Sequence, residues 1–266
     1  MLGQIAAIAV VLAVLAALYA VLQHFWPSIR GQRLYRPGLW TDLAYWLLSP
    51  IINRGFVQIV TVAALVPVAL AVGVALPDLK NGWGPVASLP LWVQAAAIFV
   101  LGDFIGYWVH RYTHRGWWWR VHAIHHSSAQ LDWLAAARVH PFNDALGALA
   151  HAVPLVAIGF APIAVASVLP VFTRYAVTLH ANLSWDYGPL RAVIASPRFH
   201  RWHHTSAEEG RDRNFAGLFP VWDILFGTYY MPKGVQPQVF GVGERVPPGL
   251  IGQLASMVLF VTRWDT

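Results

Sequence analysis

Cysteine is absent from this 266-residue chain. Without it the chain cannot form a disulfide framework, a cysteine-ligated zinc site, an iron–sulfur cluster or a thiolate-bound haem. Charged residues are scarce as well, at 11% of the chain against about 25% in ordinary soluble domains. The hydrophobic share is 57%, so too little charge remains to cover the surface of a soluble globule. These values indicate an integral membrane protein with room for one membrane domain.

Long apolar stretches mark candidate membrane helices. Residues 2–22, 56–76 and 91–109 are each long enough to cross a hydrocarbon core of ~30 Å. Residues 145–185 are also apolar, and at ~1.5 Å per residue we expect a tight hairpin of two helices there. The tail at 249–262 is too short to cross, so we expect it to lie on the membrane or pack on the domain. The sequence therefore predicts an all-α integral membrane protein with about four transmembrane helices.

The arginines predict the orientation of the chain in the membrane. Most of them fall in the polar segments 23–55, 110–144 and 186–248, which share one side of this arrangement. Only Lys80 and Arg174 fall in turns on the other side. The positive-inside rule then places the histidine-rich segments in the cytoplasm and the N-terminus outside, as expected for a bacterial inner-membrane protein. We attribute the net charge of +6 to the arginines that set the orientation in the membrane. We therefore expect no nucleic-acid partner.

Histidine is unusually abundant, with 12 copies against 12 acidic residues in total. Three tight clusters stand out in the sequence: His110 with His114, then His122 with His125 and His126, then His200 with His203 and His204. Positions i, i+3 and i+4 share a face of a helix, so we expect each cluster to project its imidazoles in one direction. The alternative is that these are polar residues at helix ends. Chance would give an HxxHH triplet only about 0.02 times in such a chain, and two occur.

Four further histidines stand apart from the clusters. His180 and His140 lie in the histidine-rich region, and each is a candidate ligand, a support for a ligand, or a helix-end residue. His24 lies at a membrane interface and His151 lies within an apolar run. We expect both of these to be structural.

The number of clustered imidazoles predicts two metal ions, because zinc takes four ligands and octahedral iron six. The chain has no Glu-x-x-His motif and no HExxH motif, which argues against a ferritin-like carboxylate site and against a zincin protease. Neutral imidazoles do not cancel two dications, so carboxylates should accept N–H bonds from the ligands. The candidates are Asp103, seven residues before His110 on the same helical face, and then Asp144, Asp186 and Asp223.

Together these motifs resemble the fatty acid hydroxylase/sterol desaturase superfamily of histidine-rich membrane di-iron oxygenases. The similarity runs from about Asp103 to Tyr229. In order, it comprises Tyr107-Trp108-Val109-His110, the His122 triplet, Arg138-Val139-His140-Pro141, His180-Ala181-Asn182, the His200 triplet and Trp222-Asp223. The chain departs from the pattern at Phe215-Ala216, where many members read Tyr-Gly after the asparagine. It also has Ser184 where fatty acid 2-hydroxylases have a further histidine, which favours a sterol-desaturase-like member.

The resemblance implies where the site lies and what it contains. A cytoplasmic helical cap would hold two iron ions, with zinc possible in purified protein, and there would be no catalytic residue beyond the metal ligands. The implied ligands are His110, His114, His122, His125, His126, His180, His200, His203 and His204, with His140 as a further candidate. Asp103, Asn182 and Asp223 would support them. We expect residues 1–90 to be membrane anchor helices with an interfacial segment, 91–235 the catalytic domain and 236–266 a C-terminal tail.

The resemblance also implies an enzyme that uses O₂ and external electrons to hydroxylate or desaturate an unactivated C–H bond of a lipid. The lipid could be sterol-like, fatty-acyl or another isoprenoid or alkyl lipid. A ferredoxin or a cytochrome b5-like donor could dock on the basic residues Arg111, Arg115, Arg120 and Arg201, although these arginines could equally serve topology alone. A zinc hydrolase and a non-catalytic dimetal lipid-binding protein stay open as alternatives, because imidazole suits zinc as well as iron.

Overall fold

The computed structural model describes residues 2–75, 78–242 and 246–255. These residues form helices and loops, and their extended pairing is limited to two isolated β-bridges. The prediction of an all-α chain is confirmed. The elements are α1 Leu2–Phe25, α2 Leu39–Val72, η1 Asp78–Asn81, α3 Gly84–Ala87, α4 Leu91–Thr113, α5 Gly116–His126, η2 Trp133–Ala137, α6 Pro141–Ile158, α7 Pro162–His180, η3 Gly188–Ala192, α8 Pro197–His203, η4 Glu208–Gly210, α9 Val221–Leu225 and α10 Gly249–Ala255.

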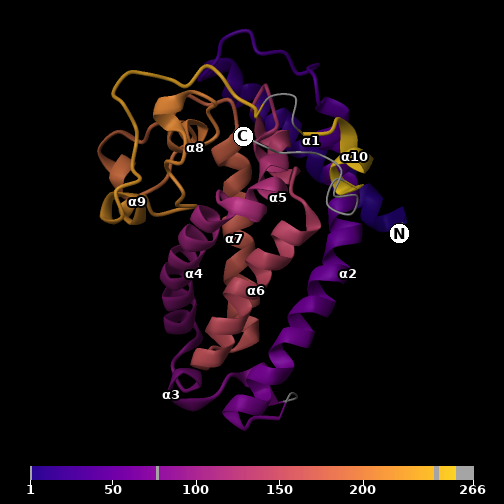
Figure 1. Ribbon diagram of the computed structural model, residues 1–266, viewed down its shortest axis with the longest axis vertical. Helices are drawn as coiled ribbons and strands as arrows, with labels where there is room; N and C mark the ends of the chain where they lie inside the picture. Colours follow the sequence, from indigo (N-terminus) through magenta and orange to yellow (C-terminus); the bar gives the residue numbers. More distant parts are fainter. Residues whose placement is uncertain (1, 76–77, 243–245, 256–266) are drawn as a thin grey trace.

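Five of the described helices are long and apolar enough to cross a membrane, so the chain is a multi-pass membrane protein. They are α1, the part of α2 from Asn53 to Val72, α4, α6 and α7. The predicted count of about four is not confirmed, because the three separate apolar runs and the two helices expected at 145–185 together give five candidate spans. The helices α2, α4, α6 and α7 run along the long axis of the molecule (Figure 1).

The expected hairpin between α6 and α7 is confirmed, and its turn has a clear physical cause. Gly159 ends α6 in the left-handed region (φ 111°), and a Cβ there would clash with the carbonyl oxygen of Trp83. Trp83 closes the turn by donating from its backbone N–H to Gly159 (3.1 Å) and from its ring to Val156 (2.8 Å). Pro162 then starts α7 in the first turn, where its missing N–H costs nothing.

α1 lies near one end of the molecule, against η2 and the beginning of α2 (Figure 1). Tyr19 stacks on Trp133 with ring centroids 5.5 Å apart, and its hydroxyl bonds to Thr178 near the end of α7 (2.8 Å). The opposite side of α1 exposes apolar side chains such as Val14, at 61%. An apolar exposed face of this kind is suited to lipid.

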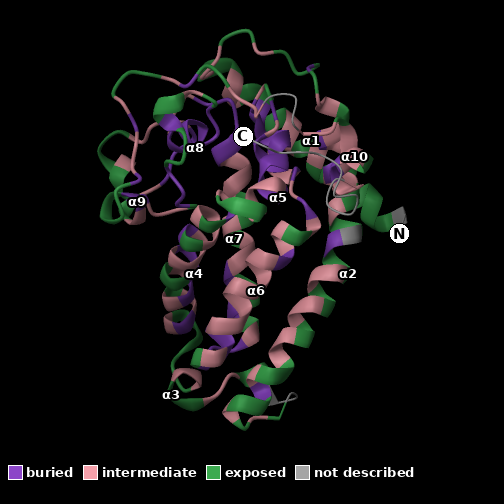
Figure 2. Ribbon diagram, in the orientation of Figure 1, coloured by how far each residue is buried: buried purple, intermediate pink, exposed green. Residues whose placement is uncertain are grey.

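A cap of α5, η2, α8 and α9 covers the end of the bundle where α4 and α7 finish (Figure 1). Buried residues are concentrated in this cap, whereas the long helices are mostly intermediate or exposed (Figure 2). The cap also buries many polar groups, among them the clustered histidines. The membrane helices therefore position a polar core at one end of the bundle.

Two features differ from the sequence expectations, and a third lies partly outside the described residues. Arg174 lies within α7 and not in a turn. Lys80 lies in η1, directly before α3, and α3 lies at the end of the bundle opposite the cap (Figure 1). Arg201 is fully buried, donates to the carbonyl of Leu131 (2.9 Å) and lies over the ring of Phe240, so it forms no part of an exposed basic face. The expected tail is described only through α10, and the remainder of 249–262 lies outside the described residues.

Candidate metal centre

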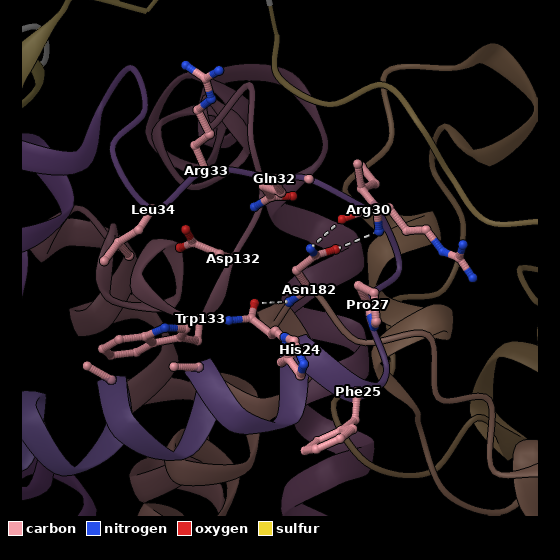
Figure 3. Close-up of a pocket in the computed structure, with 15 residues that line it drawn as sticks. His24, Phe25, Pro27, Arg30, Gln32, Arg33, Leu34, Asp132, Trp133 and Asn182 are labelled. Atoms are coloured by element: carbon pink, nitrogen blue, oxygen red, sulfur yellow. Dashed lines mark hydrogen bonds between the residues drawn. The ribbon is translucent and has the colours of Figure 1, made fainter.

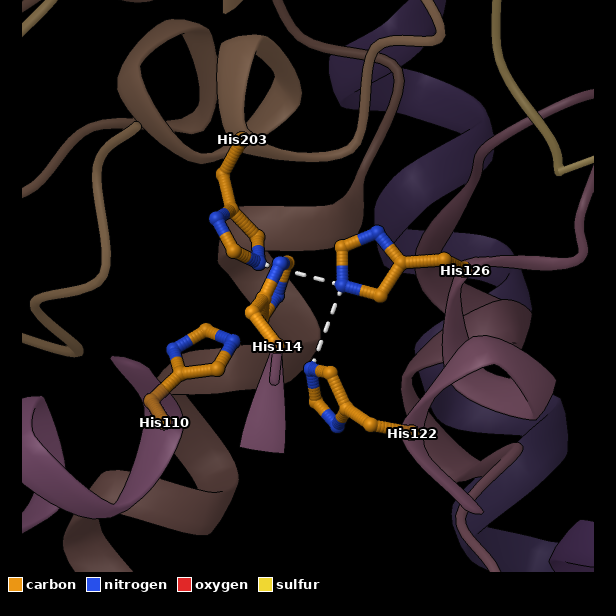
Figure 4. A group of neighbouring side chains, drawn as sticks. All are labelled: His110, His114, His122, His126 and His203. Carbon is orange, nitrogen blue, oxygen red and sulfur yellow. Dashed lines mark hydrogen bonds between the residues drawn. The ribbon is translucent and has the colours of Figure 1, made fainter. Parts of the chain in front are cut away.

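Nine histidines from distant parts of the chain converge in the cap as two groups. The five-histidine group consists of His110, His114, His122, His126 and His203 (Figure 4). The four-histidine group consists of His125, His180, His200 and His204. Within each group the potential ligand atoms all lie within 4.8 Å of one another. The structure thus brings together all nine of the principal predicted ligands.

Each HxxHH triplet is divided between the two groups, contrary to the expectation that each would project in one direction. His122 and His126 join the five-histidine group, whereas His125 joins the other. In the second triplet, His203 joins the five-histidine group, while the i, i+4 pair of His200 and His204 joins the other. Positions i+3 and i+4 differ by ~100° around a helix, so neighbouring imidazoles can face different centres. The motif therefore serves two adjacent sites.

Oxygen acceptors orient the rings through Nδ1. The Nδ1 atoms donate to backbone carbonyl or side-chain oxygens, as follows: His110 to Phe215 O (2.8 Å), His114 to Asp212 Oδ1 (3.1 Å), His122 to Asn143 Oδ1 (3.0 Å), His125 to Arg138 O (3.2 Å), His180 to Ala176 O (2.6 Å) and His203 to Arg213 O (2.7 Å). A neutral imidazole with its proton on Nδ1 carries a lone pair on Nε2. These six rings are therefore fixed in the tautomer that ligates through Nε2.

The inward-facing Nε2 atoms fit a bound cation. Nε2 of His125 lies 3.0 Å from Nε2 of His180, although each ring already donates from Nδ1 to a carbonyl. When both rings are neutral and carry their proton on Nδ1, each Nε2 presents a lone pair to the other. The two lone pairs repel each other unless a positive charge lies between them. In the other group, the Nε2 atoms of His110 and His114 are buried with no hydrogen-bond partner. These Nε2 atoms can therefore serve as ligands to metal ions.

Burial keeps the cap histidines in the form that binds metal. Loss of hydration lowers the pKa of His122, His125, His126, His203 and His204 well below its usual range, and the neighbouring imidazoles lower it further. The rings are therefore neutral at pH 7, as metal coordination requires. Nitrogen donors of this kind suit iron, copper, nickel and zinc.

The residues matched by the fatty acid hydroxylase family model are 95–228, half of the chain, and they include every histidine of both groups. The chain belongs to the fatty acid hydroxylase family. This confirms the family predicted from the motifs, and with it the class of oxygen-dependent lipid hydroxylases.

Curated relatives carry related activities in their names. The chain is 30% identical over 246 residues to ornithine lipid hydroxylase OlsE of Rhizobium tropici, covering 90% of this chain and 72% of that protein. It is 31% identical to the alkylglycerol monooxygenases of Caenorhabditis elegans and Homo sapiens, over 53% and 48% of this chain. The chain spans only 28% of each of those two proteins. No solved structure matches the chain.

None of the four predicted carboxylates touches a histidine ring: Asp144 accepts from Asn53 (2.6 Å) and Asp186 pairs with Arg198 (2.8 Å). The other two, Asp103 and Asp223, hold the loop that contacts the rings. Asp223 accepts from the backbone N–H groups of Phe215 and Ala216 (2.8 Å each) and from the Thr228 hydroxyl (2.6 Å). Asp103 accepts from the backbone of Leu218 and Phe219, at 2.8 Å each, and from the ring of Trp222 at 3.0 Å. This loop supplies the carbonyl acceptors of His110 and His203. The two carboxylates therefore support the ligands through the backbone, one step further away than expected.

The remaining predicted residues lie outside both groups. Asn182 bonds to both backbone groups of Ile29 (2.9 Å each). His140 caps α6 by accepting from the Phe142 N–H (3.2 Å). Of the two histidines expected to be structural, His151 bonds to the Gly147 and Gly102 carbonyls (2.6 and 3.0 Å) and so joins α6 to α4. His24 lines a separate cavity at the end of α1, away from both groups.

A buried ion-pair network supports the four-histidine group. Asp42, at the start of α2, is completely buried between Arg36 (2.7 Å) and Arg138 (2.6 Å), and Arg36 also binds Asp132 at 2.5 and 2.7 Å. Arg138 in turn provides the carbonyl acceptor of His125. The network therefore ties the beginning of α2 to one candidate ligand. Arg138 belongs to the Arg-Val-His-Pro motif, but nothing in the sequence marked the two aspartates.

Two side chains that contact ligands were not predicted. Asn143 accepts from His122, and it stands beside Asp144 in the first turn of a mostly apolar helix, a polar position that the sequence shows. Asp212 accepts from His114, and that hydrogen bond lowers the pKa of the Asp212 carboxyl. Asp212 lies in a left-handed conformation (φ 55°) in an irregular loop. No helical spacing relates it to His114, so pattern reasoning could not find it.

Proposed function

We propose that the chain is a membrane-bound di-iron oxygenase that hydroxylates an unactivated C–H bond of a lipid. Each hydroxylation would consume one O₂, place one oxygen atom in the C–H bond and release the other as water, with two electrons and two protons from an external donor. The two histidine groups would hold one iron ion each. Both ions, when bound, would supply the redox chemistry that reduces O₂ and oxidises the lipid.

The observation that carries this proposal is the pair of adjacent all-histidine groups with inward Nε2 lone pairs. The nine histidines are the proposed ligands, and His140 is left out because it lies outside both groups. Within the described residues no Asp or Glu belongs to either group. Two cationic centres side by side suit a reaction in which both act on one O₂ molecule, and the family membership supports this reading.

The chain's own residues would control access and orientation. The cap residues that surround the groups are buried, which limits water at the site. The carbonyl oxygens of Phe215, Arg213 and Arg138 keep the rings in the ligating tautomer. The membrane helices below the cap would deliver the lipid. We further propose that the cap faces the cytoplasm of a bacterial cell, because Lys80 lies at the opposite end from the arginine-rich loops.

The electron donor would be an acidic ferredoxin or a cytochrome b5-like protein. Its proposed docking surface includes Arg115, which is exposed, with the half-buried Arg111 and Arg120 nearby in sequence. Opposite charge on the two partners would speed their encounter and make it sensitive to salt.

Oxygen consumption tests the proposed function. Full-length protein in lipid nanodiscs, loaded with ferrous iron and supplied with reductant, should consume O₂ when lipid substrates are added and should form hydroxylated lipid in equal amount. His203→Ala removes a proposed ligand and should abolish both. The control His151→Gln changes a residue outside both histidine groups, so O₂ consumption and product formation should stay at the wild-type level. Product formation that continues under strict anaerobiosis would instead support a hydrolase.

A further inference from the structure

A cavity of about 570 Å³ lies between the end of α1 and the loop that follows it (Figure 3). Its lining comes from the second half of α1, including Ala16, Ala20 and Gln23, from the following loop, including Arg30, Gln32 and Arg33, and from Asp132, Trp133 and Asn182. Small-molecule sites have typical volumes of ~300–1,000 Å³, so the cavity has the size of a binding site. It is separate from the two histidine groups and contains none of their residues.

The lining of this cavity is amphipathic. Ala16, Ala20 and Trp133 are apolar, whereas Gln23 and His24 at the end of α1 and Arg30, Gln32 and Arg33 of the loop are polar or charged. On the outside of α1, apolar residues such as Leu18 are exposed, as on a surface that faces lipid. The cavity therefore lies where a lipid-facing helix meets a polar loop, which is the level of a lipid headgroup.

The rim of the cavity carries positive charge with no compensating acid. Arg30 and Arg33 are exposed on either side of Gln32 (Figure 3), and neither forms an ion pair with a described residue. Asp132 is the one acidic residue of the lining, and both of its carboxylate oxygens are bound by the buried Arg36. The charge at the rim therefore complements an anionic group.

The lining of the cavity is hydrogen-bonded to the segment that follows His180, a member of the four-histidine group. Asn182 binds both backbone groups of Ile29 (2.9 Å each), and its carbonyl accepts from the Ser28 N–H (3.3 Å). His180, a member of the four-histidine group, is two residues earlier, a chain length of at most ~7 Å. A ligand in the cavity is thus held beside the metal centre.

We propose that this cavity binds the anionic headgroup of a membrane lipid, through phosphate or carboxylate, with the acyl chains directed along α1. The cavity would present this class of lipid to the metal centre, and that last statement rests on the proposed function. The binding itself does not, because it needs neither metal nor O₂.

Native mass spectrometry of the full-length protein in detergent tests the binding, with phosphatidylglycerol and phosphatidylcholine of identical chains as probes. Each interfacial arginine contributes about fivefold to anionic-lipid affinity, so Arg30→Gln with Arg33→Gln should weaken phosphatidylglycerol binding by about 25-fold. Arg54→Gln removes an exposed arginine that does not line the cavity and should leave binding unchanged. Ala20→Phe should block the cavity, whereas Ala17→Phe, on an exposed position outside it, should not.

Several results would overturn the proposal. These are equal affinity for the two lipids, wild-type binding by the double arginine variant, or an equal loss in the Arg54→Gln control. Glycerol 3-phosphate that binds as tightly as the lipid would show a site for soluble anions instead. Circular dichroism and the melting temperature, measured on the same samples, verify that each variant is folded. A failure here would leave the oxygen-consumption test of the proposed function unaffected.

Discussion

Asp223→Asn tests how the loop around Phe215 controls the five-histidine group. Asp223 is completely buried and its carboxylate accepts three hydrogen bonds. Asparagine keeps the shape but replaces one acceptor oxygen with a donating NH₂ group. That group faces a donor, the N–H of either Phe215 or Ala216, and so leaves a buried N–H without a partner.

The magnitude follows from these contacts. A hydrogen bond to a charged group contributes about 1.5–3 kcal/mol, and a buried unsatisfied donor costs about 1–3 kcal/mol. We therefore expect the variant to be about 2–4 kcal/mol less stable. The shifted loop carries the carbonyl acceptors of His110 and His203, and loss of such support lowers metal affinity by about 10–100-fold. The four-histidine group does not bond to this loop, so its affinity should change little.

Anaerobic titration of chelator-stripped protein with cobalt(II) measures both groups as separate binding steps. One step should weaken in Asp223→Asn and the other should remain. Asp186→Asn is the matched control, because Asp186 pairs with Arg198 (2.8 Å) and contacts no ligand or ligand acceptor. The reasoning is refuted if both steps keep wild-type affinity in Asp223→Asn, or if the control weakens binding equally.

Three further predictions concern stability and topology. Gly38→Ala should lower the melting temperature in detergent, because φ is +83° and the new Cβ would lie 2.6 Å from Nη2 of Arg138; an unchanged value would contradict this. Asp42→Asn leaves two buried arginines without their shared anion and should cost about 3–5 kcal/mol, measured by chemical unfolding, so wild-type stability would argue against the network. A cysteine beside Lys80 should react with an impermeant reagent in intact cells, and one beside Glu208 only after permeabilisation; the reverse pattern would overturn the proposed orientation.

The sequence predicted the histidines well because their signal is local. Helical spacing and their rarity elsewhere identified the three clusters, and all nine histidines predicted as principal ligands lie in the two groups. The same spacing could not show that His125 and His126 face different centres. That division depends on how α5 and α8 are rotated against each other, which is a property of tertiary packing.

The supporting residues were harder to predict because their partners are distant. Asp103 was predicted from its spacing to His110, but its partners Leu218 and Phe219 lie more than a hundred residues later. Asp42 was not among the predicted residues, because only the fold brings it to Arg138, 96 residues later in the chain. The position of α1 near the cap likewise depends on contacts such as Tyr19 with Trp133, which no hydrophobic run reveals.

Metal stoichiometry is the most direct test of the two-centre arrangement. Elemental analysis of anaerobically purified, fully active protein should give two metal ions per chain, because two separate sets of histidines are present. His204→Ala should lower the content, since it removes a ligand of the four-histidine group, whereas His24→Ala should leave it at two. One ion per chain in a fully active preparation would contradict the proposed dimetal centre.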